Sequence, residues 1–346
     1  MSRTFAAAAF LLGSLAAAAA SEFKEFKDVS VSCTNGLTCS VSLKVEGEPG
    51  TLNTLSFQRK AGEGTALDLV VAAQDLDKGS IVSISVDGKA VMSIPVDAME
   101  YNADWYEYKL TGVADPINLL DAMRNGLRAE AKGMKGGETL TASYSLSGLV
   151  AALIFADEVQ GRLETPDALQ ARGTKTAPPT RARDIEAIAD LPDGVREDFE
   201  GEGKCSFLDE SSFARAGGFE ADIDDRYSLL ALPCAEGGAY NQPYVLYAGY
   251  DGGDFEQLYL ATMGDKGPTV TGFAYNIGWD RKSKVLEAFF KGRGLGDCGS
   301  YEKWEMSVRG VGPAFSLVMA RVKGDCDGQD GGGIDSWPAV WPIGKP

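Results

Sequence analysis

The sequence predicts a mainly β protein made of two β-rich domains of β-sandwich or jelly-roll type, the first with one or two packed helices. Three observations lead to this prediction. Apolar or alternating runs of strand length fill both halves of the chain. Only two segments have the length and the end signals of helices, and a stretch rich in proline and charge separates the halves.

The chain begins with a segment typical of secretory signal peptides. In residues 1–20, one positive charge at Arg3 precedes an apolar run, and small residues stand before Ser21. We expect a Sec-type signal peptide that is cleaved near Ala20–Ser21, and therefore a periplasmic protein, with secretion as the alternative. No later run is long and apolar enough to span a bilayer, so we expect no membrane span.

Residues 21–165 are predicted to form the N-terminal β-rich domain. Its expected strands are VSCTNGLTCSVSLKV, LNTLSFQRK, TALDLVVAA, IVSISVDGKAVMSIPV and TLTASYSL. Two helices are expected between and after these strands. The first is capped by Asp115 and ends at Gly126, and the second is capped by Ser147 and closed by Gly161.

Residues 166–200 are predicted to form a linker that is rich in proline and charge, with one short helix at Arg183–Ala189. Residues 201–346 are predicted to form a C-terminal β-rich domain that is stapled by disulfides. Its expected strands are RYSLLALPC, QPYVLYAGY, FEQLYLATM, TVTGFAYNIGWD, KVLEAFFKG, WEMSVRG and AFSLVMARV.

The six cysteines point to disulfides, because an exported chain folds in an oxidising compartment and the sequence contains neither histidine nor a CxxC pair. From domain membership we predict the pairs Cys33–Cys39, Cys205–Cys234 and Cys298–Cys326. In CTNGLTC, Asn35-Gly36 indicates a hairpin turn. Cys33 faces Cys39 only if the loop has an odd number of residues centred on Gly36.

The absence of histidine excludes Ser-His-Asp and Cys-His catalysis as well as any imidazole base. We expect no cofactor and no metal site. The net charge is −17, and loss of Arg3 with the signal peptide makes it −18. Nonspecific binding of nucleic acid is therefore not expected, whereas attraction to a basic partner is possible. A role of the charge in solubility is the alternative.

Two glycine-rich stretches of the second half are candidate binding loops. KGRGLGDCG (residues 291–299) offers Lys291 and Arg293 to an anion or carboxylate, or is a turn that leads into a disulfide. PCAEGGAYN (residues 233–241) could bind a sugar or peptide, or pack as a turn. The hypothetical site combines Tyr240, Asn241, Lys291, Arg293 and Asp297.

A second basic stretch, RKSK (residues 281–284), is predicted to lie at the other end of a strand over Val285–Phe290, and so outside this site.

PCAEGGAYN, KGRGLGDCG and the closing WPAVW (Trp337–Trp341), together with SLSGLVAALIFADEVQGR and TPDALQARG, resemble the DUF1176 family. This family consists of exported proteobacterial proteins of unknown function, and the resemblance covers nearly the whole mature chain. The N-terminal half is distantly similar to the invasion-associated locus B family, whose exported β-rich proteins have a comparable cysteine-flanked opening. The first resemblance implies a periplasmic protein in two β-rich parts, and it implies no activity and no catalytic residue.

We therefore expect an exported periplasmic binding or accessory protein rather than an enzyme. One alternative is an acidic inhibitor of a basic envelope protein such as a lysozyme. The other is a carbohydrate-active enzyme that uses paired carboxylates. The partner is unknown; a basic envelope protein and a small anionic or glycan ligand are both possible.

Overall fold

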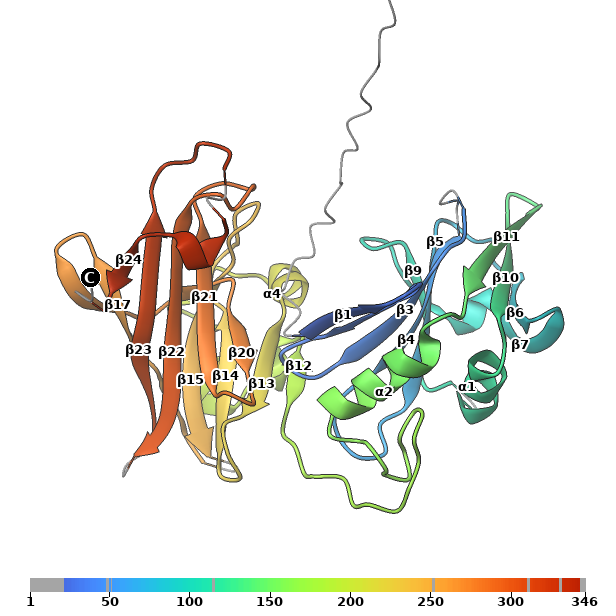
Figure 1. Ribbon diagram of the computed structural model, residues 1–346, viewed down its shortest axis with the longest axis horizontal. Coiled ribbons are helices and arrows are strands. Elements are labelled where there is room, and N and C mark those ends of the chain that lie inside the picture. Colours follow the sequence, from blue (N-terminus) through green and yellow to red (C-terminus); the bar gives the residue numbers. More distant parts are fainter. Residues whose placement is uncertain are drawn as a thin grey trace, which may run out of the picture.

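The computed structural model describes residues 22–47, 50, 52–113, 116–250, 253–309, 312–329 and 332–342. It is mainly β, with several antiparallel sheets and few helices, which confirms the predicted fold class. Two β-rich parts lie side by side, one built from the first half of the chain and one from the second (Figure 1). No helix among these residues has the length and apolar character needed to cross a membrane.

The N-terminal part contains two antiparallel sheets. The larger sheet has the order β1-β2-β3-β4-β5-β9-β8, with β1 at Glu22–Phe26, β2 at Val29–Cys33, β3 at Cys39–Lys44, β4 at Leu52–Arg59, β5 at Leu67–Ala73, β8 at Glu100–Asn102 and β9 at Glu107–Leu110. The smaller sheet has the order β11-β10-β6-β7, with β6 at Ile81–Val86, β7 at Lys89–Pro95, β10 at Arg128–Lys135 and β11 at Glu138–Ser145. A 3₁₀ turn at Val96–Ala98 follows β7.

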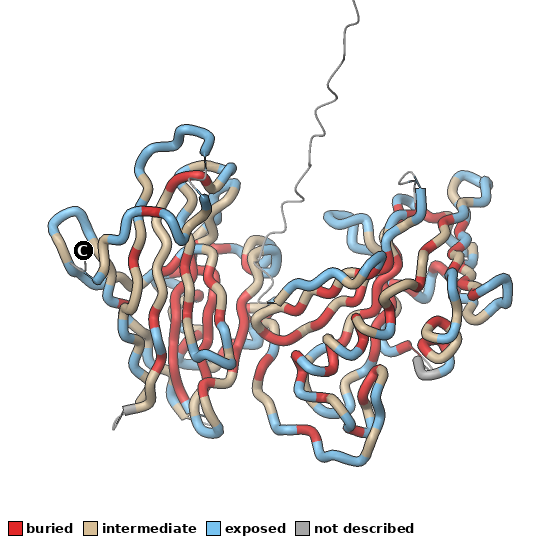
Figure 2. The backbone as a smooth tube through the Cα atoms, in the orientation of Figure 1, coloured by how far each residue is buried: buried red, intermediate tan, exposed pale blue. Residues whose placement is uncertain are grey.

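Helices α1 (Pro116–Arg124) and α2 (Leu149–Val159) complete this part, as predicted. Both sheets and both helices contribute to one apolar core, whose residues are among those coloured red in the right-hand part of Figure 2. The predicted cap Ser147 is wrong, because Gly148 occupies the N-cap of α2 with a φ of 104°. A Cβ atom there would lie 1.8 Å from the carbonyl oxygen of Phe26, so only glycine fits. Gly161 closes the helix as expected, with a φ of 68°, and Asp115 lies outside the described residues.

The C-terminal part is a sandwich of two larger sheets with a hairpin at its edge. One sheet contains β12 (Arg183–Ile185), β13 (Gly218–Asp222), β14 (Tyr227–Pro233), β15 (Pro243–Tyr250) and β16 (Phe255–Gln257), and β19 (Ala274–Tyr275) also pairs with β15. The other contains β20 (Gly278–Asp280), β21 (Val285–Lys291), β22 (Gly299–Arg309), β23 (Gly312–Lys323) and β24 (Ala339–Trp341). The hairpin is β17 (Leu260–Gly264) with β18 (Gly267–Thr271).

Two cores stabilise the C-terminal part. The first lies between the two sheets and includes Trp279 and Trp304. The second lies on the other face of the β12–β16 sheet. Three short elements cover it: a 3₁₀ turn at Ile188–Asp190 and the helices α3 (Asp193–Arg196) and α4 (Glu210–Ala216). A last 3₁₀ turn spans Ile334–Ser336.

Two segments of this part that were each predicted as one strand form several separate strands instead. FEQLYLATM is divided between β16 and β17, which belong to different sheets. TVTGFAYNIGWD is divided among β18, β19 and β20, again in three different sheets. Asn276, with a φ of 46°, turns the chain between the last two. Strand β21 does separate the RKSK turn from the KGRG loop, as predicted.

The three predicted disulfides are all present, at Cys33–Cys39, Cys205–Cys234 and Cys298–Cys326. Cys33 faces Cys39 across the β2–β3 hairpin, whose loop is residues 34–38. The odd loop centred on Gly36 is therefore confirmed. Three disulfides indicate that the protein folds in an oxidising compartment outside the cytoplasm.

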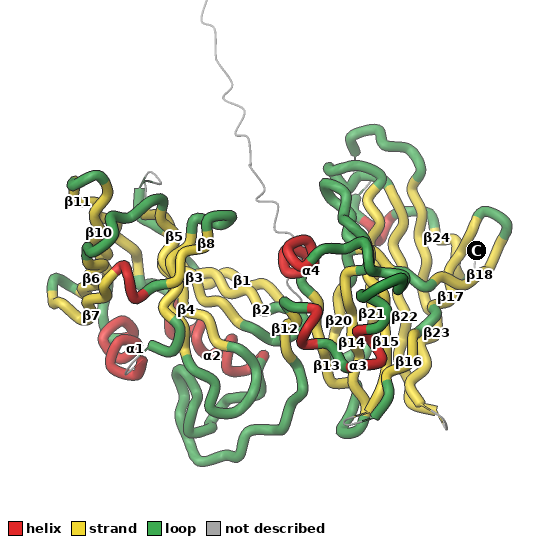
Figure 3. The backbone as a smooth tube through the Cα atoms, turned by 180° about the vertical axis from the view of Figure 1, so that it is seen from behind, coloured by secondary structure: helices red, strands yellow, loops and turns green. Residues whose placement is uncertain are grey.

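The predicted linker is packed over most of its length. Residues 160–182 contain no regular element and run from α2 to β12 as a long loop (Figure 3). The predicted helix at Arg183–Ala189 is wrong, because residues 183–185 pair with β13 as an edge strand. Burial of Ile185 against the second core outweighs the local helix preference.

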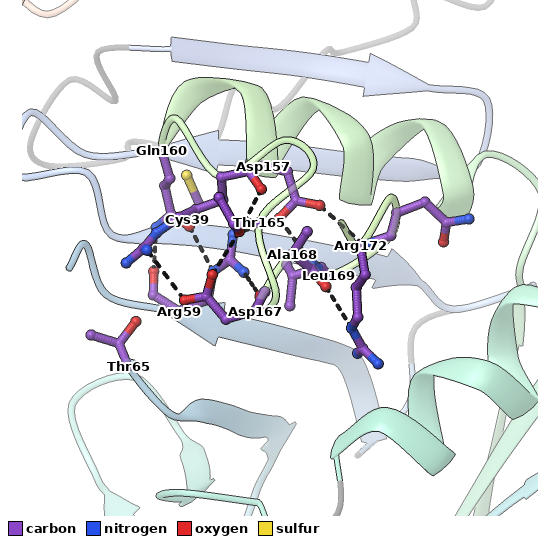
Figure 4. Close-up of polar contacts among 12 residues, drawn as sticks. Cys39, Arg59, Thr65, Asp157, Gln160, Thr165, Asp167, Ala168, Leu169 and Arg172 are labelled. Carbon is purple, nitrogen blue, oxygen red and sulfur yellow. Dashed lines mark hydrogen bonds and ion pairs between the residues drawn. The ribbon is translucent and has the colours of Figure 1, made fainter. Parts of the chain in front are cut away.

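A buried ionic network holds the start of this segment against β4 (Figure 4). The Arg59 guanidinium donates hydrogen bonds to Asp157 at 2.7 Å and to the Gln160 side-chain oxygen at 2.7 Å. Asp157 also accepts from the backbone N–H groups of Leu169 and Gln170. Burial lowers the pKa of Arg59, and the neighbouring Asp157 opposes this shift. The network therefore connects strand β4, helix α2 and the loop of residues 160–182 through charged groups that are shielded from solvent.

The stapled β2–β3 hairpin joins the two parts of the molecule. The Thr34 hydroxyl donates to the Asp184 carboxylate at 2.9 Å, and the backbone N–H of Trp279 donates to the Asn35 side chain at 3.0 Å. Gly36 is buried against β12, where a Cβ atom would lie 2.3 Å from the carbonyl carbon of Arg183. Burial raises the pKa of Asp184, whose carboxyl group faces the hairpin.

Candidate functional site

Four of the five residues predicted as a binding site lie on two adjacent loops, and the fifth, Lys291, is the last residue of β21. The Asn241 amide donates to the backbone oxygen of Lys291 at 2.8 Å and accepts from its N–H at 2.9 Å. The Tyr240 ring lies against Gly294, where a Cβ atom would be 3.5 Å from a ring carbon. Arg293 donates two hydrogen bonds to Asp297, at 2.8 and 2.7 Å. The predicted proximity of the two loops is therefore found.

Most polar groups of these loops are engaged with one another. The Asn241 amide binds the backbone of Lys291, at the end of β21, as a neighbouring strand would. The positive charge of Arg293 is paired with the carboxylate of Asp297. The ammonium group of Lys291 differs, since within the described part of the chain it forms no hydrogen bond or ion pair. It lies 5.8 Å from the centre of the Phe289 ring. Lys291 is thus the member of the set best able to meet a ligand, and the binding role of all five stays a prediction.

Asp297 anchors the second loop. Besides Arg293, it accepts a hydrogen bond from the backbone N–H of Gly328 at 2.7 Å. The hydrogen bonds from Arg293 hold the pKa of Asp297 far below its usual range. The neighbouring Cys298–Cys326 disulfide ties the same loop to the segment that follows β23.

Asp297→Asn is expected to destabilise the protein in a pH-dependent way. A carboxyl group whose pKa is lowered on folding stabilises the native state fully above its unfolded pKa of about 3.9, and this contribution fades as the pH falls toward the folded value. The unfolding midpoint of the variant should lie below that of the parent protein at neutral pH, and the gap should shrink below about pH 4. Urea titrations at several pH values measure this gap, with the exposed Asp325→Asn as control. A gap that is independent of pH would contradict the prediction.

A groove with a volume of about 1370 Å³ lies between the two parts of the molecule. The N-terminal part contributes Glu22, Leu37 and Val159, and the connecting segment contributes residues 179–181. The C-terminal part contributes most of the remaining wall, including Lys291. Of the five predicted site residues, only Lys291 lines this groove. Arg281 and Lys282 of the RKSK stretch, which was predicted to lie outside the site, line the same groove. The remaining lining residues come from segments far apart in the chain, which no local motif connects.

The charged groups of the groove are largely paired with one another. Asp222 is bound by the Thr180 hydroxyl at 2.5 Å and by Arg281 at 3.1 Å. Elsewhere in the groove, the Tyr301 hydroxyl donates to Glu287 at 2.6 Å. Burial, together with Glu287, raises the pKa of Tyr301 above its usual range. These hydrogen bonds and ion pairs hold the lining side chains in place. The ammonium group of Lys291, in contrast, has no such partner among the described residues.

The groove offers little support to a hydrolytic mechanism. A general acid needs a raised pKa. Among the described carboxyl groups, burial raises the pKa of Glu107, Asp184 and Glu302, and none of these lines the groove. The alternative of an enzyme with paired carboxylates stays a prediction. No group of three or more potential metal-ligating side chains occurs in the described ranges.

Comparison with known proteins places the chain in a family. A family model described as "Protein of unknown function (DUF1176)" matches residues 23–344. The chain is also similar to the uncharacterized protein YpfG of Escherichia coli (strain K12), with 26% identity over 355 residues that cover 92% of each protein. Since the family model spans nearly all of the sequence beyond the expected signal peptide, the chain belongs to the DUF1176 family.

Proposed function

We propose that this protein is a periplasmic binding protein whose ligand occupies the groove between its two β-rich parts. The observation that carries the proposal is the groove itself, since large cavities at domain junctions are the usual place of ligand sites. The signal-like N-terminus and the three disulfides support the periplasmic location.

The chemistry of the walls favours a ligand that carries an anionic group and a flat or apolar face. Lys291 offers an unpaired ammonium group, and the ring of Phe289 lies beside it. Tyr301 and Phe289 are neighbouring aromatic rings of the same wall, with centroids 6.3 Å apart. Aromatic rings commonly pack against apolar faces, while one or two polar groups fix the orientation of the ligand. An acidic glycan fragment has both features.

The groove is preformed, because contacts within the protein already fix its lining residues. The stapled hairpin places Leu37 on one side, and the ion pair between Asp222 and Arg281 fixes the other. A preformed site loses less conformational entropy on binding than a mobile one. This rigidity supports a binding role, because affinity can then come from a few well-placed contacts.

Isothermal titration calorimetry tests the proposal with a glucuronic-acid disaccharide and a neutral disaccharide as probes. Loss of a charge-assisted hydrogen bond costs about 1.5–3 kcal/mol, so Lys291→Met should weaken binding of the acidic probe about tenfold or more. The matched control is Lys266→Met, on the exposed turn between β17 and β18, which should bind as the parent does. Native mass spectrometry of protein purified with intact disulfides should show a co-purified small molecule. No bound mass, together with no heat for either probe, would overturn the proposal.

The inhibitor hypothesis stays a prediction that rests on the net charge. It differs from ligand binding in what a column of immobilised protein retains. One basic envelope protein that binds at low salt and elutes with rising salt would favour inhibition, since attraction between exposed charges is screened by salt.

A further inference from the structure

We propose that a second, smaller cavity binds a compact organic cation, with Glu302 as the anionic contact and Phe273, Tyr275 and Phe290 as aromatic walls. The cavity has a volume of about 200 Å³. It opens at the edge of the C-terminal sandwich, where β19, β21 and β22 meet the β17–β18 hairpin. Ala288 is the one lining residue that this cavity shares with the groove, and the inference does not depend on the function proposed above.

Glu302 lies on β22 among small neighbours. In register it faces Ala288 of β21 and Ala320 of β23, so both of its direct cross-strand neighbours have small side chains. One carboxylate oxygen accepts a hydrogen bond from the Thr262 hydroxyl at 2.5 Å. Glu302 is one of the residues that line the cavity, and it is the one acidic residue among them.

The carboxylate has no cationic partner within the described ranges. Its pKa is raised by burial, and the Thr262 hydroxyl and the backbone N–H of Met263 oppose this shift; no lysine or arginine contributes. A carboxylate withdrawn from water without a counter-charge is costly. A bound cation would supply the missing charge, which makes the ionised form of Glu302 favourable.

Three aromatic rings surround the same cavity and remain partly open to solvent. Phe273, Tyr275 and Phe290 are 40%, 36% and 41% exposed, so the rings do more than close the core beneath them. Tyr275 and Phe290 meet edge to face, with centroids 5.1 Å apart. Aromatic rings around an anionic group are the usual surroundings of ammonium ligands, because the ring faces carry negative charge density.

The charge of the whole protein favours the same class of ligand. A net charge of −17 raises the local concentration of small cations around the protein. A neutral sugar could also stack on the rings, but it would leave the half-buried carboxylate without a counter-charge. The size of the cavity limits the ligand to a compact group such as a quaternary ammonium or the end of an alkylamine.

Choline is the probe, and its neutral isostere 3,3-dimethylbutan-1-ol and glucose are the comparisons. We expect choline to bind in the millimolar range or better, and the other two to bind at least about tenfold more weakly. Glu302→Gln keeps the shape and an acceptor for Thr262, and should weaken choline binding about tenfold. The control is Glu305→Gln, an exposed residue on the same strand, which should leave binding unchanged.

Two further measurements separate binding from a merely structural role. Phe290→Leu keeps the core filled and should weaken choline binding severalfold, since it removes a ring face. The affinity for choline should rise with pH as Glu302 ionises, and this rise should vanish in Glu302→Gln. NMR titrations follow both. The proposal is overturned by choline binding that survives Glu302→Gln, by a preference for glucose, or by no choline binding up to about 10 mM.

Discussion

Replacing Gly36 with alanine is expected to force apart the two β-rich parts of the molecule. The added methyl group would lie 2.3 Å from the carbonyl carbon of Arg183 and 2.4 Å from the backbone nitrogen of Asp184. Both atoms belong to the backbone of a paired strand, so neither can move as a side chain would. Overpacking of this kind costs about 1–3 kcal/mol. Movement of the hairpin would also weaken the hydrogen bonds of Thr34 and Asn35.

Two measurements report this change. Urea unfolding should show a lower midpoint and a less cooperative transition, because the two parts no longer support each other. Small-angle X-ray scattering should show a larger radius of gyration. The control is Gly324→Ala, at a position where no described atom lies within 4 Å of the added methyl group and φ is not positive. If the radius of gyration and the urea midpoint of Gly36→Ala equal those of the parent protein, the prediction is wrong and β12 moves to accommodate the methyl group.

Arg59→Met is expected to cause the largest loss of stability. It removes the cation from a network in which the Asp157 side chain is 0% exposed and the Arg59 side chain is 4% exposed. Breaking a buried pair by removing one partner costs about 3–5 kcal/mol, because the remaining charge is left without compensation. The same change removes the hydrogen bond to Gln160, which also holds the backbone oxygen of Leu37. The free energy of unfolding from urea titration measures the loss.

Matched variants show whether the buried charge is responsible. Arg128→Met removes an arginine whose side chain is 63% exposed and which pairs with Glu46, and its cost should stay below about 1 kcal/mol. The double variant Arg59→Met with Asp157→Asn should be more stable than Arg59→Met alone, because no uncompensated charge remains. Equal losses for Arg59→Met and Arg128→Met would contradict this account.

The sequence allowed prediction of those features that neighbouring residues determine. The Cys33–Cys39 staple follows from a short turn signal and a count of loop residues, and the spacing of RKSK from KGRG follows from strand geometry. The cap of α2 was wrong because the preference of Ser147 is local, whereas the fit of Gly148 depends on Phe26, more than a hundred residues earlier. Local preference cannot reveal such a contact.

The sites were predicted less well than the strands for the same physical reason. Apolar runs such as TVTGFAYNIGWD show strand preference but not which sheet each part will join. The groove takes its walls from both ends of the chain, so Lys291 was identified without its neighbours. Glu302 is one acidic residue among fifty and belongs to no motif. Its distinguishing features are burial, the absence of a cation among the described residues around it, and the aromatic rings beside it, all of which arise only on folding.

The hydrogen bond between Asn35 and Trp279 joins residues 244 positions apart, and it therefore imposes an order on assembly. The N-terminal half leaves the ribosome or the export channel first. Cys33 and Cys39 are close enough in sequence to be oxidised before the rest of the chain has emerged. The stapled hairpin can therefore form before Trp279, its contact in the other part of the molecule, has been synthesised.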